Sequence, residues 1–96
     1  MQTHSSSDVA VKAARALREL TERDHPSVDE YLRTLERNSR ALRRANPSHA
    51  SLHNTQQEIV RAVADAEPET VERARELTEA AIDRVIERVE RGKRLA

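Results

Sequence analysis

Residues 71–89 read VERARELTEAAIDRVIERV, and this stretch decides the fold class. Its apolar residues recur every three or four positions, the spacing at which side chains share one face of an α-helix. They are Val71, Ala74, Leu77, Ala81, Ile82, Val85, Ile86 and Val89. Acidic residues precede or begin the predicted helix and basic residues end it, which suits the helix dipole; they are Glu67, Glu69 and Glu72, and Arg88, Arg91, Lys93 and Arg94. We therefore predict a long final helix with Pro68 in its first turn.

The same periodicity predicts three earlier helices, over residues 7–22, over residues 27–46, and from Ser48 or Ser51 to residue 64. Pro26 and Pro47 separate them, because the residue before a proline avoids the helical conformation. Ser27 and Glu30 have the spacing of a capping box at the start of the second helix. The predicted fold is all-α: a compact bundle of about four helices, of which the final helix is the longest.

The predicted core is thin, because hydrophobic residues make up 36% of the chain and aromatic residues 1%. We expect its buried residues to be Leu17, Leu20, Leu35, Leu42, Ile59, Val63, Leu77, Val85 and Ile86, and the apolar face of the first helix to include Ala16. Arg33, Arg37, Arg40 and Arg44 form a stripe opposite Leu35, so we expect these arginines to face solvent. A thin core favours a module that packs on a larger domain or associates with itself.

The composition excludes several classes of function. The 17 basic and 17 acidic residues cancel, which argues against a dedicated nucleic-acid or anionic-membrane binder. The chain has no cysteine, and its apolar runs are short, so we expect a cytoplasmic protein without membrane contact. His49 and His53 are four residues apart, but no further ligand completes a metal site. The single glycine, Gly92, excludes a glycine-rich phosphate loop, and we identify no catalytic set and no cofactor site.

Two segments place small polar residues and histidines at the start of a predicted helix. The candidate anion-contacting residues are His4, Ser5, Ser6, Ser7, Asn46, Ser48 and His49. Unpaired backbone N–H groups and the positive end of the helix dipole favour an anion at such positions. A polar ligand would therefore contact these two segments.

The same two segments resemble a known family. Residues 1–17, MQTHSSSDVAVKAARAL, resemble the first helical segment of the family that joins the α, β and δ subunits of translation initiation factor 2B with ribose-1,5-bisphosphate isomerase. Residues 45–54, ANPSHASLHN, resemble that family's Arg-Pro-Thr segment with the Leu and Asn that follow it. The archaeal initiation-factor-2B-like members are the most similar, and the order of the helices is also alike over nearly the whole chain.

The resemblance implies that residues 1–96 form a single N-terminal helical domain, in a family whose Rossmann-like α/β domain follows it. His4 and Ser5 stand where the isomerase branch has Arg-Gly, and Asn46 stands where it has the Arg of Arg-Pro-Thr. Both strong phosphate contacts are thus replaced. We expect no catalysis by this chain alone and only weak contact with sugar phosphates or nucleotides.

The implied role is that of a pocket wall and protein-interaction surface, in translation initiation or in nucleotide and sugar-phosphate metabolism. The expected partner is a protein, either the α/β domain of a related chain or a second copy. The alternative is a free-standing helical interaction module that associates with itself or binds a partner helix.

Overall fold

The computed structural model describes the backbone of residues 6–95 and the side chains of residues 10–92. It contains four helices, α1 (Ser6–Thr21), α2 (Val28–Ala45), α3 (Ala50–Asp65) and α4 (Val71–Leu95). Residues 6–95 contain no strand, and α4 is the longest helix with 25 residues. The predicted all-α class, the four helices and the long final helix are confirmed. None of the described helices is long and apolar enough to cross a membrane.

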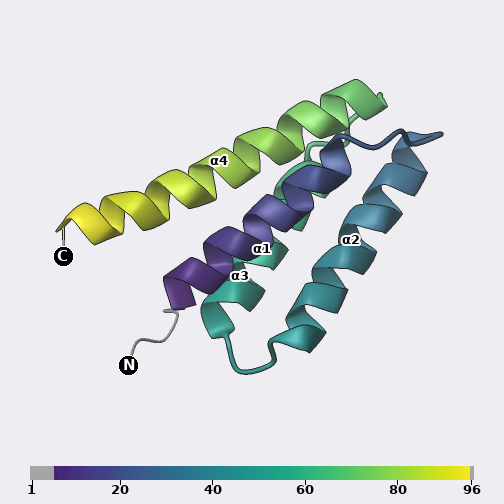
Figure 1. The fold of residues 1–96 in the computed structure, drawn as a ribbon. Coiled ribbons are helices and arrows are strands. Elements are labelled where there is room, and N and C mark those ends of the chain that lie inside the picture. The colour runs from purple at the N-terminus through teal and green to yellow at the C-terminus, as the bar shows by residue number, and fades with distance from the viewer. Residues whose placement is uncertain (1–5, 96) are drawn as a thin grey trace.

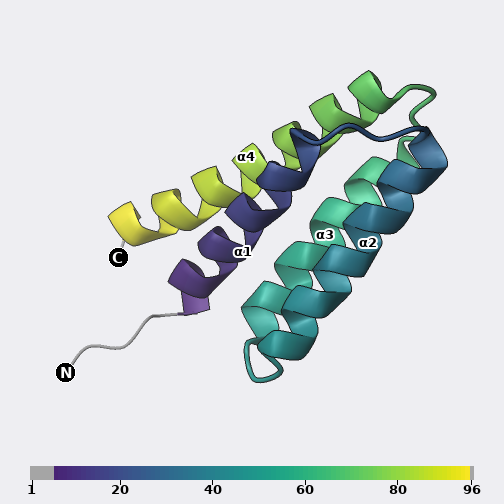
Figure 2. The same ribbon diagram turned by 45° about the vertical axis from the view of Figure 1, so that its right-hand side comes forward.

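The helices run alternately up and down, so α1 and α3 point in one direction and α2 and α4 in the other (Figure 1). Helices α1, α3 and α4 each pack against the other two, whereas α2 packs mainly on α3 (Figure 2). The loops between α1 and α2 and between α3 and α4 therefore lie at one end of the bundle. The loop between α2 and α3 lies at the other end, together with the first turn of α1.

Side chains at the helix ends explain where two of the helices begin. Ser27 caps α2, since its hydroxyl accepts a hydrogen bond of 3.2 Å from the backbone N–H of Glu30. The prediction that Pro68 lies in the first turn of the last helix is wrong, because α4 begins at Val71. Glu67, just after α3, has a left-handed φ of 49°, and Pro68 lies in the loop between the two helices. Helix α4 begins later because Thr70 accepts a hydrogen bond of 3.0 Å from the N–H of Arg73.

The core is formed by the predicted helix faces, but some predicted residues are less buried than expected. Six of the nine predicted residues are buried, namely Leu17, Leu20, Leu35, Ile59, Val63 and Val85. Leu42, Leu77 and Ile86 are only partly buried and pack against the edge of the core. On α1, Ala16 is exposed, whereas the neighbouring Ala14 is fully buried. The stripe of Arg33, Arg37, Arg40 and Arg44 is exposed as predicted.

Tyr31 connects α2 to α4 inside the bundle. Its hydroxyl donates a hydrogen bond of 2.8 Å to Thr78 Oγ1, and the Thr78 hydroxyl donates one of 2.8 Å to the carbonyl of Ala74. The ring of His25 packs edge-on against the Tyr31 ring, with 4.8 Å between the centroids. Both hydroxyl protons of this buried chain therefore have an acceptor, as buried polar groups require.

Burial raises the pKa of the Tyr31 hydroxyl above its ordinary value, because the charged phenolate is poorly solvated there. The unfolded chain then loses this proton before the folded chain does, so stability is kept below a pH of about 10 and falls as the pH rises further. Tyr31 is the only tyrosine, so tyrosinate absorbance reports on it alone. We expect a higher titration midpoint in buffer than in concentrated urea, and equal midpoints would contradict the buried position.

Candidate functional site

Asn46 forms the loop between α2 and α3 by closing one helix and anchoring the next. Its side-chain Nδ2 donates a hydrogen bond of 3.0 Å to the carbonyl of Leu42, and its backbone N–H donates one of 3.2 Å to the carbonyl of Arg43. The Asn46 carbonyl accepts hydrogen bonds from the backbone N–H of His49 at 3.2 Å and from His53 Nε2 at 3.1 Å. The backbone and the amide nitrogen of Asn46 thus hold the loop in shape.

The start of α3 carries no negative charge. His49 occupies the N-cap position but makes no side-chain capping hydrogen bond, and the first turn of α3 contains no acidic residue. Arg43 and Arg44, in the last turn of α2, add positive charge next to the same loop. Ser48 is exposed and His49 is half-buried. The dipole of α3 is not opposed by negative charge in its first turn, and that an anion binds at this loop stays a prediction.

The second predicted segment lies largely outside the described part of the chain. His4 and Ser5 are not described, and of Ser6 and Ser7 only the helical backbone is described. Because α1 and α3 run in the same direction, the first turn of α1 lies at the same end of the bundle as the loop of Asn46 and Ser48 (Figures 1 and 2). That the two segments form one site stays a prediction.

His49 precedes α3 as its N-cap residue, and His53 lies in the first turn of the helix. His53 Nε2 lies against the carbonyl of Asn46, which engages this ring nitrogen in a hydrogen bond. In residues that the structure describes, no group of three or more histidine or acidic side chains could hold a metal ion. One ring nitrogen of His53 is therefore engaged within the loop itself.

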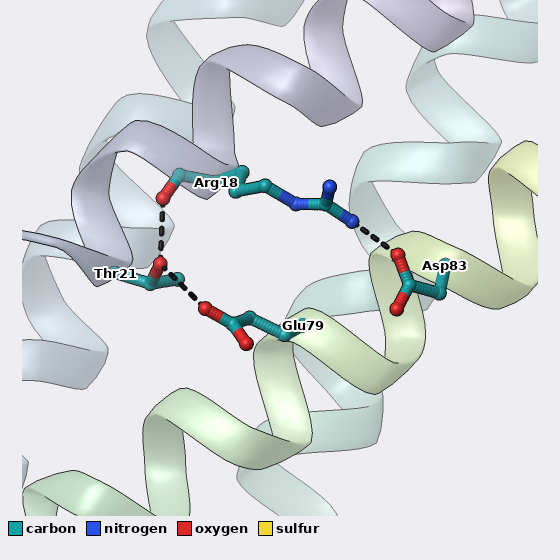
Figure 3. A network of polar contacts seen from close by, with 4 residues as sticks. All are labelled: Arg18, Thr21, Glu79 and Asp83. Atoms are coloured by element: carbon teal, nitrogen blue, oxygen red, sulfur yellow. Dashed lines mark hydrogen bonds and ion pairs between the residues drawn. The ribbon is translucent and has the colours of Figure 1, made fainter.

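A second polar cluster, not identified from the sequence, joins α1 to α4 (Figure 3). Arg18 forms an ion pair with Asp83, and the Thr21 hydroxyl lies 2.6 Å from the Arg18 carbonyl and 3.3 Å from Glu79 Oε2. The signal in the sequence is weak, because these residues are 58 and 65 positions apart. Thr21 has a single proton to donate, and the shorter contact is to the carbonyl. The cluster orients α1 on α4, and nothing in it supplies an activated nucleophile.

The arginine stripe of α2 is partly neutralised by its own helix. Arg33 lies 3.9 Å from Glu30 and Arg40 lies 3.6 Å from Glu36, at the spacings of one helical turn. Pairs as exposed as these contribute little to stability. The stripe therefore has the character of a solvated helix face.

The chain matches a known protein family. The family model described as "Initiation factor 2 subunit family" matches residues 2–96. Neither the curated proteins nor the solved structures include a match to this chain. The match covers both polar segments, residues 4–7 and residues 46–49.

Proposed function

The chain belongs to the initiation factor 2 subunit family, and from this premise we propose that it serves as the N-terminal helical domain of an initiation-factor-2B-like or ribose-1,5-bisphosphate isomerase-like protein. The observation that carries the proposal is the family match over residues 2–96. In this role the bundle forms one wall of a pocket that a Rossmann-like α/β domain completes. The domain acts in the cytoplasm, in translation initiation or in nucleotide and sugar-phosphate metabolism.

The loop between α2 and α3 supports this role through its charge and position. The helix dipole of α3 and the cations Arg43 and Arg44 favour an anionic ligand group there. The first turn of α1 begins at the same end of the bundle. A phosphate-bearing ligand held by a neighbouring α/β domain would thus meet two helix starts.

The chain alone is proposed to have no isomerase activity. Asn46 holds the loop in place of the arginine that the isomerase branch has there, and its Nδ2 is already hydrogen bonded to Leu42. We expect no turnover of ribose-1,5-bisphosphate and only weak binding. Turnover of any sugar phosphate by the purified chain would refute this part of the proposal.

Titration of ribose-1,5-bisphosphate and AMP into ¹⁵N-labelled protein tests whether the two segments share one partial pocket. We expect the amide signals of residues 5–7 and of Ser48 to move together. Ser48→Glu should weaken these shifts, because it places a carboxylate at the helix start. Ala41→Glu adds the same charge to the exposed face of α2 and should leave them unchanged.

Two outcomes would contradict the proposed pocket. Shifts confined to residues 33–44 and reduced by Ala41→Glu would identify the arginine stripe as a polyanion site. Shifts of Ser48 without those of residues 5–7 would show that the segments do not converge on one ligand.

A further inference from the structure

Helix α4 carries a row of acidic side chains along its outer face. At about 100° per residue they fall within about 80° of arc, opposite the buried Ala74 and Val85. This acidic ridge consists of Glu72, Glu76, Glu79, Asp83, Glu87 and Glu90, all of them exposed. Between residues 72 and 91, the arginines of α4 lie outside that arc. The ridge is therefore a surface of one sign of charge.

The arginine stripe of α2 matches part of this ridge in spacing. Its four arginines are separated by four, three and four residues, and so are the first four members of the ridge. Each set extends about 16 Å along its helix. Because this spacing is the same when read in either direction, the two rows can face each other with their helices parallel or antiparallel.

Both rows keep charges that their own chain does not neutralise. Arg37 and Arg44 form no ion pair with another residue of the described part of the chain. In the ridge, Glu72, Glu79 and Glu90 likewise form no ion pair with a described residue. Exposed charges of opposite sign are therefore available on the two helices.

The two surfaces lie on opposite sides of the bundle. In both views α1 lies between α2 and α4, and α2 and α4 are the two helices that touch each other least (Figures 1 and 2). Each row is turned away from the core, since one is opposite Leu35 and the other is opposite Ala74. One chain therefore cannot bring its two rows together, whereas two chains can.

We propose that the acidic ridge of one copy of this chain binds the arginine stripe of a second copy. The contact joins two different surfaces, so each added copy leaves one of each kind free and the copies form an open row. Exposed ion pairs are individually weak and are screened by salt, so the association is weak and favoured at low ionic strength. This contact does not rest on the proposed function, and each can fail without the other.

Sedimentation velocity over a range of protein concentrations tests this contact. At about 20 mM salt we expect the average sedimentation coefficient to rise with concentration, and at about 0.5 M salt we expect that of the monomer. In ¹⁵N-labelled protein, the same increase in concentration at low salt should shift the amide signals of residues 33–44 and 72–90 together.

Charge reversal separates a specific contact from general attraction. Arg37→Glu with Arg40→Glu should weaken the association about ten-fold, and so should Glu76→Arg with Glu79→Arg, because like charges then face each other. These are the middle two members of each matched row. The chain with all four substitutions regains complementary surfaces and the net charge of the parent, so it should associate as the parent does.

The matched control is Lys12→Glu with Arg61→Glu. It changes the net charge as much as the α2 variant does, at exposed positions outside both rows, and should leave most of the association intact. All of these substitutions are at exposed positions, so we expect the helical circular dichroism signal to be kept.

Four results would overturn the proposal. A sedimentation coefficient independent of concentration at low salt would show that the copies do not associate. A chain with all four substitutions that stays monomeric, or an equal loss of association in the control, would show that the pairing of the two rows is not what joins them. Shifts of residues 33–44 alone would show that the arginine stripe binds an anion of the buffer instead.

Discussion

Replacing Leu35 with alanine is expected to lower the free energy of unfolding by about 2–4 kcal/mol. Leu35 is 1% exposed and belongs to the core cluster with Tyr31 and Ile59. The substitution removes buried apolar surface and leaves a cavity that rigid neighbouring helices fill only partly. In a domain of this size the loss is a large part of the total stability.

Urea unfolding followed by circular dichroism measures this effect. Arg37→Ala is the matched control, because it also introduces alanine into α2, but at an exposed position. It should change the free energy of unfolding by less than about 0.5 kcal/mol. Equal midpoints for the two variants would mean that the face of α2 carrying Leu35 is not the buried one.

The helical period predicts which face of a helix points into the bundle, but it does not predict the exposed fraction of each side chain on that face. Leu42 has the correct spacing from Leu35, yet it is only partly buried because α2 packs mainly on α3, at the periphery of the bundle. On α1, the helical period places Ala16 on the apolar face, yet Ala16 is exposed. The packing of α3 and α4 on α1 buries Ala14 instead of Ala16. Depth depends on which helices surround a position, and tertiary packing decides that.

The positions of three buried polar residues could have been predicted from the sequence, although a search for apolar residues alone does not find them. Three polar residues lie on the inward-facing side of their helices. Each comes four residues after one apolar residue of that side and three residues before another, which is the spacing of a single helix face. Ser39 follows Leu35, Gln56 follows Leu52, and Thr78 follows Ala74, and all three polar residues are at most 1% exposed. A polar residue at the right period is thus a candidate for the core.

The candidate sites differ in how far they could be predicted. The loop near Asn46 follows from Pro47 and from local helix-end chemistry, so the sequence is sufficient to locate it. A pocket between α2 and α3, to which Ser39 and Arg61 contribute, requires the register of the two helices, which no single helix determines. Pairs distant in sequence, such as Arg18 and Asp83, are likewise visible only after the bundle has formed.

Replacing Gln56 with methionine is expected to raise the free energy of unfolding by about 1–3 kcal/mol, because a buried unpaired amide costs that much. Gln56 is 0% exposed, and neither its Nε2 nor its Oε1 has a hydrogen-bond partner. Methionine keeps an unbranched side chain of similar length, so it fills the same space without the polar atoms.

Thermal and urea unfolding of Gln56→Met are compared with those of Gln57→Met, the neighbouring glutamine on the exposed side of α3. The control introduces the same residue one position along, where burial changes little, so its stability should stay within about 0.5 kcal/mol of the parent chain. A higher midpoint for Gln56→Met alone identifies the buried amide as a cost to folding. A lower midpoint would mean that the Gln56 amide makes hydrogen bonds inside the bundle, since only a satisfied buried amide stabilises the fold when methionine is the alternative.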